Sequence, residues 1–157
     1  MLAFLILLAA ACGYRFTAPS SALPEGIQKV RVPVFVNATS EPGVEALFTQ
    51  ALRDQLLRAG RLGGDAEPAT VEGRVLAVSS APVVASPGRL PSYRLSALVN
   101  LKLSQGARAV TEVTVSGTED FPSGADVLWS EANRGAALRR LADSLMRDGA
   151  ERLASGG

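Results

Sequence analysis

The residue with the clearest chemistry in this sequence is Cys12, the single cysteine of the chain. It follows an uncharged run of ten residues, 2–11, which ends in three alanines. A bilayer span needs about 20 apolar residues, so this run suits the apolar region of a secretory signal peptide. Small residues before a cysteine let a signal peptidase reach the backbone, and diacylglycerol then modifies the thiol. The pattern predicts a lipoprotein signal peptide over residues 1–11.

An acylated Cys12 would anchor the mature chain, because two or three acyl chains hold a protein firmly in a bilayer. The consensus prefers leucine three residues before the cysteine, where this chain has Ala9. The other interpretation is a buried apolar segment with a free cysteine. The Pro- and Ser-rich stretch that follows favours the lipoprotein, with residues 12–26 as acylated cysteine and tether. A single cysteine allows no internal disulfide.

Residues for catalysis are sparse. The chain has no histidine, which excludes a Ser-His-Asp triad, a Cys-His pair and the commonest zinc ligands. Carboxylates such as Asp54, Glu72 and Asp120 are scattered without a pairing pattern. The Gly63-Gly64 pair lacks the Lys-Ser/Thr of a phosphate-binding loop. We therefore expect no enzyme activity, no metal and no cofactor.

Composition indicates one folded domain without an affinity for nucleic acid. About 145 residues follow Cys12, enough for one domain with its own core. The chain carries 16 basic and 15 acidic residues, a net charge of +1, which gives no bulk attraction to a polyanion such as duplex nucleic acid.

Hydrophobic periodicity predicts four strands and two helices around this core. In residues 27–36 the valines at 30, 32, 34 and 36 alternate with Lys29, Arg31, Pro33 and Phe35, which predicts a strand. Further strands are expected over residues 71–78, 93–103 and 110–121, the last two as a hairpin around Gln105-Gly106. Apolar residues at helical spacing predict helices over 44–59, ended by Gly60, and 130–153, where Gly149 weakens the last turns.

The predicted order is β-α-β-β-β-α. A helix between two strands favours a right-handed crossover with parallel pairing, whereas the later hairpin is antiparallel. The simplest arrangement is an α+β two-layer sandwich, in which two helices cover one face of a four-stranded mixed sheet.

Three segments resemble the LPS-assembly lipoprotein LptE family. They are CGYRF at residues 12–16, LPEGIQKVRVPVFVNATSEPGVE at 23–45 and SEANRGAALRRLADSL at 130–145. Their combination is fairly specific, and the element order agrees across the mature chain. The resemblance implies an LptE-like domain over residues 27–154.

It also implies a function at the periplasmic side of the outer membrane. Family members fill the lumen of the β-barrel translocon LptD and help deliver lipopolysaccharide to the outer leaflet. Gly13 after the cysteine, in place of aspartate, argues against retention in the inner membrane. The alternative is a lipoprotein adaptor of another envelope or secretion complex that binds protein only.

Lipopolysaccharide carries phosphates, so its binding site would present cations. Arg89, Arg94, Lys102 and Arg108 cluster in sequence around the predicted hairpin, and Arg94 and Lys102 share strand parity. We expect these four residues to bind lipopolysaccharide; the alternative is a solvated sheet face.

Two connections, the loop at 82–91 and the turn at 37–42, are suited to reaching the walls of a barrel, or are simply exposed. Trp129 is expected to act as a hydrophobic staple before the last helix instead of an interface anchor.

Overall fold

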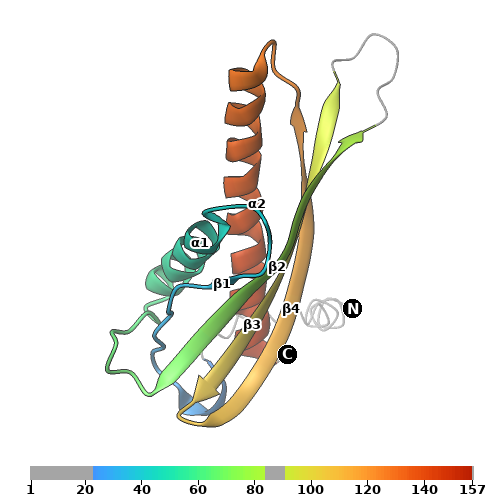
Figure 1. Ribbon diagram of the computed structural model, residues 1–157. Helices are drawn as coiled ribbons and strands as arrows, with labels where there is room; N and C mark the ends of the chain where they lie inside the picture. Colours follow the sequence, from blue (N-terminus) through green and yellow to red (C-terminus); the bar gives the residue numbers. More distant parts are fainter. Residues whose placement is uncertain (1–22, 84–90, 157) are drawn as a thin grey trace, which may run out of the picture.

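The computed structural model describes residues 23–83 and 91–156 (Figure 1). The predicted signal peptide, Cys12 and Arg89 lie outside the described residues. In chain order the elements are η1 (Pro24–Gly26), β1 (Val36–Asn37), α1 (Val44–Arg58), β2 (Ala69–Val83), β3 (Ser92–Gln105), β4 (Arg108–Pro122) and α2 (Val127–Ser155).

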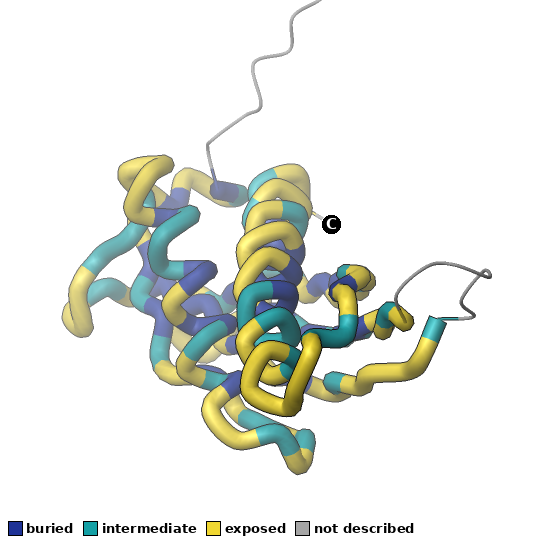
Figure 2. Tube along the Cα trace, turned by 90° about the horizontal axis from the view of Figure 1, so that it is seen from above, coloured by how far each residue is buried: buried dark blue, intermediate teal, exposed yellow. Residues whose placement is uncertain are grey.

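The sheet has the order β1-β2-β3-β4, with β1 parallel to β2 and the remaining neighbours antiparallel. Both helices cover the same face, since α1 contacts β2, α2 contacts β3 and β4, and the helices contact each other. Viewed end-on, buried positions gather between the helices and the sheet (Figure 2). The predicted α+β class and the β-α-β-β-β-α order are confirmed.

The hairpin and the first helix match the sequence pattern closely. All alternate apolar residues of β3 from Leu95 to Leu103 are buried under the helices. Helix α1 ends at Arg58 with Ala59 as its C-cap, and Gly60 follows with a φ of 68°, a left-handed conformation that favours glycine.

Helix α2 is longer than predicted at its N-terminus. It begins at Val127, because the Asp126 side chain accepts a hydrogen bond of 2.8 Å from the backbone N–H of Trp129 and caps the helix. Near the other end, Gly149 is buried against β3. A Cβ atom there would lie 2.5 Å from Leu101 Cδ1. The glycine therefore lets the helix approach the sheet, and the helix continues beyond it to Ser155.

The sequence pattern assigned the wrong side chains of the first predicted strand to the protein interior. Val30 and Val32 are buried as expected, but Val34 and Val36 are 62% and 56% exposed, whereas Phe35 is 3% exposed. The alternation of the valines therefore does not follow one face of the sheet.

Pairing with β2 explains this reversal. Arg31 forms an isolated parallel bridge with Thr70, and Val36 in β1 pairs with Arg74. From the first pair to the second, the N-terminal segment advances five residues (31 to 36) and β2 only four (70 to 74). One extra residue on one strand turns the following side chains to the opposite face.

The reversal places the Phe35 ring over Gly73 of β2. A Cβ atom at Gly73 would lie 2.4 Å from three atoms of this ring. The backbone N–H of Phe35 also donates a buried hydrogen bond of 2.9 Å to the Thr49 hydroxyl of α1. Phe35 thus fixes the N-terminal segment between the sheet and the first helix.

The helices differ in length, and this leaves one end of the sheet less covered. Helix α1 has 15 residues and α2 has 29. Beyond α1, the first turns of α2 and the neighbouring ends of β2, β3 and β4 continue alone (Figure 1). No residue of α2 before Ala137 is buried. We call this part of the molecule, with α2 residues 127–136, the distal end.

Substitution of Gly73 by alanine tests the Phe35 contact. We expect Gly73→Ala to lower the free energy of unfolding by about 2–3 kcal/mol, because the new Cβ would displace a buried ring. The matched control is Gly64→Ala, where a Cβ meets no atom within 4 Å. Denaturant unfolding of both variants measures the difference, and equal stabilities would contradict the account.

Candidate functional site

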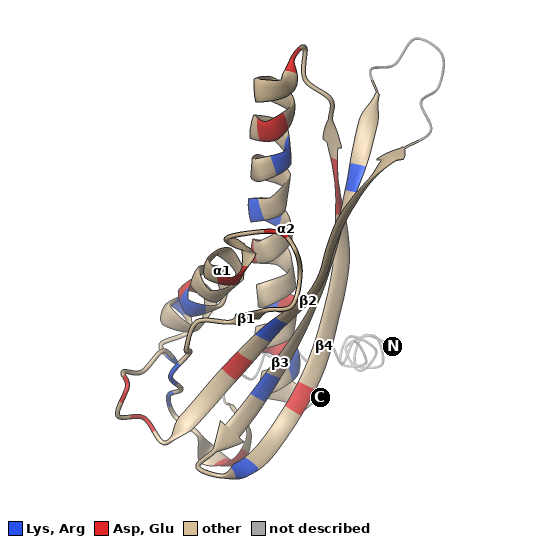
Figure 3. Ribbon diagram, viewed as in Figure 1, with Lys and Arg blue, Asp and Glu red and all other residues tan. Residues whose placement is uncertain are grey.

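No helix of the described residues covers the other face of the sheet, and charged residues are spread along its strands (Figure 3). Arg94 and Lys102 both lie on this face of β3, since the residues between them alternate with the buried positions. They are eight residues apart on one strand, a separation of roughly 27 Å at the usual rise per residue. The two cations share a face but do not form one cluster.

Arg94 is engaged by a carboxylate directly opposite on β4. Its Nε and Nη2 atoms donate hydrogen bonds of 2.7 and 2.8 Å to the two oxygens of Asp120. The hydrogen bond and the positive charge of Arg94 lower the pKa of Asp120, and the same contact raises the pKa of Arg94. Stability from this pair is therefore present above the ordinary carboxyl pKa and lost as the pH falls through the lowered one.

Lys102 has acidic neighbours on both sides. It lies opposite Glu72 of β2 and Glu112 of β4, although within residues 23–83 and 91–156 neither is within ion-pair distance of it. Next to it is a shallow pocket of about 420 Å³, lined by Arg74 and by the exposed Val34 and Val36. Glu72 also lines the pocket, so its two cations are only partly offset by one carboxylate. Two cations beside an apolar wall can take an anionic group that carries an apolar portion.

The remaining predicted cations are elsewhere. Arg108 begins β4, at the opposite end of the hairpin from Arg94, and hydrogen-bonds Glu25 of η1, with 3.1 Å between Nη1 and Oε1. Arg89 lies outside the described residues. The structure thus spreads the three described cations along the hairpin and pairs two of them with carboxylates. Lipopolysaccharide binding by the four residues stays a prediction.

Sequence reasoning missed Arg74 and the partners of the arginines. The carboxylate opposite Arg94 follows from the hairpin register, which the Gln105-Gly106 turn could have supplied. Arg74 lies two residues after Glu72 and shares its strand parity, but the pocket also needs Val34 and Val36 to face outward. Their alternation with Val30 and Val32 pointed the other way.

The turn between β1 and α1 is held by its own side chains. The Asn37 side chain donates to the backbone oxygen of Glu41 at 2.7 Å and to Glu45 Oε2 at 2.9 Å. Its oxygen accepts from the Thr39 backbone N–H at 2.9 Å, as in an Asx-turn. These bonds order the turn that we expected to be an exposed connection or a barrel contact.

Glu41 then joins this turn to α2. Its two carboxylate oxygens accept hydrogen bonds of 2.8 Å each from Arg134, which raise the pKa of the guanidinium above its ordinary value. The two side chains are only 31% and 21% exposed. Two of the segments that resemble the LptE family, around Glu41 and around Arg134, therefore meet in one ion pair.

The expected staple role of Trp129 is wrong. Trp129 lies inside the first turn of α2 and is 63% exposed, because the cap at Asp126 starts the helix before it. Its neighbours Val127 and Leu128 are 76% and 81% exposed. Three consecutive large apolar side chains, which we call the apolar tip, thus face outward at the distal end.

Two further observations concern the part of the chain that the structure describes. None of its helices is long and apolar enough to cross a membrane. No three His, Cys, Asp or Glu side chains of these residues are grouped so that they could hold a metal ion.

The ion pair between Glu41 and Arg134 predicts a measurable coupling. We expect Arg134→Ala to lower the free energy of unfolding by about 1–2 kcal/mol, because it leaves a half-buried carboxylate without its partner. The control Arg139→Ala, an exposed position on the same helix, should cost less than about 0.5 kcal/mol. A double-mutant cycle with Glu41→Ala measures the coupling; additive effects would show that the pair contributes nothing.

Comparisons with known proteins give a family match for the sequence and similar solved structures for the fold. The family model "LptE: Lipopolysaccharide-assembly" matches residues 27–153. No curated protein matches the chain. Among solved structures, the chain is similar to protein XCC0632 from Xanthomonas campestris, with a TM-score of 0.59, 14% identity, and coverage of 85% of this chain and 90% of that one.

Two further similar structures are a minor lipoprotein from Acinetobacter baumannii and the PelC dodecamer from Paraburkholderia phytofirmans. The alignment with the lipoprotein has a TM-score of 0.51 and 14% sequence identity, and it covers 82% of this chain and 92% of the lipoprotein chain. The alignment with PelC has a TM-score of 0.54 and 17% sequence identity, and it covers 81% of this chain and 87% of the PelC chain. At these identities the similarity concerns the fold alone. The family match spans most of the chain, and the protein therefore belongs to the LPS-assembly lipoprotein LptE family.

Proposed function

We propose that this protein is anchored through acylated Cys12 at the periplasmic side of the outer membrane and forms a complex with an LptD-like β-barrel. There it fills part of the barrel lumen and assists the insertion of lipopolysaccharide into the outer leaflet. It acts by binding and not by catalysis, and needs no cofactor. Residues 12–26 serve as the tether and 27–154 as the domain that meets the barrel. Membership of the LptE family supports this assignment.

The apolar tip is the observation that supports a protein partner most directly. Val127, Leu128 and Trp129 are consecutive, and each is more than 60% exposed. Large exposed apolar side chains that gather at one end of a molecule are typical of interaction sites. Tryptophan is also enriched among the residues that dominate binding energy at interfaces. We assign the tip to the contact with the barrel.

The open sheet face suits the interior of a barrel. Outer-membrane barrels have a polar lumen, which a wholly apolar surface would not match. This face combines charged and polar side chains, among them Arg74, Asn100 and Lys102, with the exposed apolar Val34 and Val36. A compact domain with this face can lie in a polar lumen while its anchor remains in the surrounding bilayer.

For lipopolysaccharide, the proposed ligands are the predicted Arg89, Arg94, Lys102 and Arg108, with Arg74 added by the pocket beside Lys102. A phosphate would compete with Asp120 for Arg94 and with Glu25 for Arg108, since both arginines already donate to these carboxylates. Lys102 has no such partner among the described residues, so an anion that binds it would displace no carboxylate.

Variants of the apolar tip test the barrel contact. We expect Leu128→Asp with Trp129→Asp to reduce the amount of barrel protein that co-purifies with the tagged chain by about tenfold or more, because interface anchors of this kind contribute at least about 1.4 kcal/mol. The control is Leu57→Asp, an exposed leucine on α1 whose exposed fraction, 63%, equals that of Trp129. Barrel retention that is equal in both would remove the tip from the interface.

Charge reversal on the sheet tests lipopolysaccharide binding. We expect Arg94→Glu with Lys102→Glu to weaken retention on immobilised lipopolysaccharide about tenfold. Asp120→Asn should strengthen it, since this change frees Arg94. The control reverses two exposed arginines away from the open face, Arg58→Glu with Arg139→Glu. Equal binding by both double variants would rule out the sheet cations.

The same two experiments distinguish the proposed function from the competing one, an adaptor of another envelope or secretion complex. An adaptor would retain a partner protein other than a large barrel, and it would not bind lipopolysaccharide with or without the sheet cations.

A further inference from the structure

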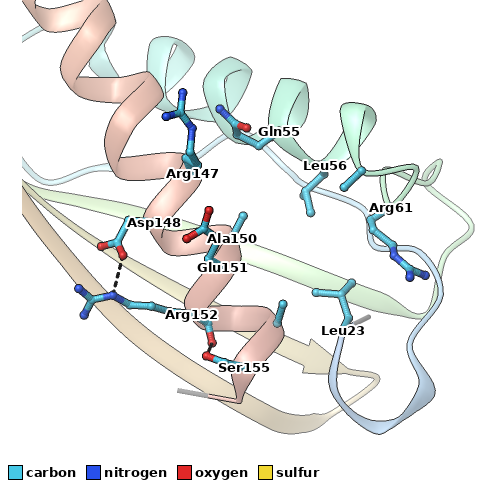
Figure 4. A pocket seen from close by; sticks show the side chains of 12 residues that line it. Leu23, Gln55, Leu56, Arg61, Arg147, Asp148, Ala150, Glu151, Arg152 and Ser155 are labelled. Atoms are coloured by element: carbon cyan, nitrogen blue, oxygen red, sulfur yellow. Dashed lines mark hydrogen bonds and ion pairs between the residues drawn. The ribbon is translucent and has the colours of Figure 1, made fainter. Parts of the chain in front are cut away.

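A second, larger pocket lies at the opposite end of the molecule from the apolar tip. It has a volume of about 510 Å³ and lies between the C-terminal ends of α1 and α2 and the segment before η1 (Figure 4). Leu56 of α1 and Leu23 face the space from two sides, and Ala150 and Ala154 of α2 line it from a third. Its lining is therefore mainly apolar and comes from three separate parts of the chain.

The N-terminal end of the described chain lies at this pocket. Leu23 is the first described residue, lines the pocket and is only 5% exposed. The residues that precede it along the chain are therefore attached at the pocket. At most about 3.6 Å per residue separates consecutive positions, so a residue seven to nine positions before Leu23 can fold back into the pocket without strain.

Two residues at that distance are aromatic. Tyr14 and Phe16 are nine and seven positions before Leu23, and they are the only aromatic residues between Cys12 and Leu23. In an extended segment these two side chains point to the same side, because strand-like residues alternate with a period of two. The segment around them is otherwise small, polar or Pro-rich, so nothing else in it could fill an apolar space of this size.

The pocket lining carries charges of both signs, with three arginines (Arg61, Arg147 and Arg152) and two carboxylates (Asp148 and Glu151). Arg15 lies between the two aromatics, and Glu151 lies at the rim of the pocket. In the described part of the chain, no cation is within ion-pair distance of Glu151, whereas the other rim carboxylate, Asp148, already binds Arg152 at 3.0 Å. A basic residue that enters with the aromatics would find an unoccupied acidic partner.

We propose that the aromatic pair Tyr14 and Phe16 docks into this pocket and holds the tether against the C-terminal ends of the two helices. The contact would shorten the free part of the tether to the residues nearest Cys12. It would fix the orientation of the domain relative to an anchored N-terminus, with the apolar tip pointing away from it. This proposal concerns the chain's own segment and does not depend on the identity of the partner.

Trypsin cleavage after Arg15 measures the docking directly. The test uses the chain from residue 12 onward with Cys12→Ser, which contains every described residue and carries no acyl group. We expect cleavage after Arg15 to be at least about tenfold slower than in a peptide of residues 12–22, a protection that corresponds to about 1.4 kcal/mol. Mass spectrometry of the early products gives both rates.

Two variants locate the protection in the pocket. Ala154→Trp fills the space and Glu151→Arg repels Arg15, so each should raise the cleavage rate toward that of the peptide. The matched control, Ala132→Trp, changes an exposed residue of the same helix far from the pocket and should keep the protection. Thermal unfolding shows whether each variant is folded, and the rim variant Glu151→Arg leaves the apolar lining intact.

Three results would overturn the proposal. One is cleavage of the unacylated chain at the rate of the peptide, including the case in which only an acylated chain is protected, since the acyl group would then be the occupant. Another is protection that survives both pocket variants. The third is protection that disappears on dilution, because a second copy of the chain would then supply the aromatics.

Discussion

The packing of one long helix along a longer hairpin determines most of this structure. Helix α2 is about 43 Å long and the strands of the hairpin about 50 Å, whereas α1 reaches only about 22 Å. Gly149 lets α2 approach Leu101, and from there the helix follows the hairpin beyond the end of α1. Because α1 is half as long, the core is complete at one end only. The distal end, with its exposed apolar tip, follows from this mismatch in length.

The LptE-like segments of the sequence serve this scaffold more than they form a binding surface. Asn37 orders the turn after β1, and Glu41 in that turn binds Arg134 of α2. The ion pair thus ties the start of the distal end to the turn that precedes α1. Phe35, which lies in the same quoted segment, packs over Gly73 and sets the position of the turn. The residues free to bind a partner lie outside these contacts.

Sequence patterns predicted those elements whose side chains follow one period throughout. Residues 93–103 alternate without interruption, and both helices and the element order were found correctly. The pattern failed where a local event changed it. One extra residue before Val36 turned the following side chains of the first strand to the opposite face. The cap at Asp126 made Trp129 part of the first turn of α2, where its side chain is exposed to solvent. The site was less predictable from the sequence. Whether Arg94 or Lys102 is free of an ion pair depends on which carboxylates lie opposite on the neighbouring strands. The pattern of one strand does not give this pairing register.

Site-specific photocrosslinking in intact cells tests most directly the proposed contact between the distal end and the barrel. A photoreactive amino acid in place of Trp129 should yield an adduct with the barrel protein, and the same group in place of Leu57 on α1 should yield far less, since both positions are 63% exposed but only one lies at the distal end. Adducts of equal yield at both positions, or an adduct at position 129 with a protein other than the barrel, would contradict the account.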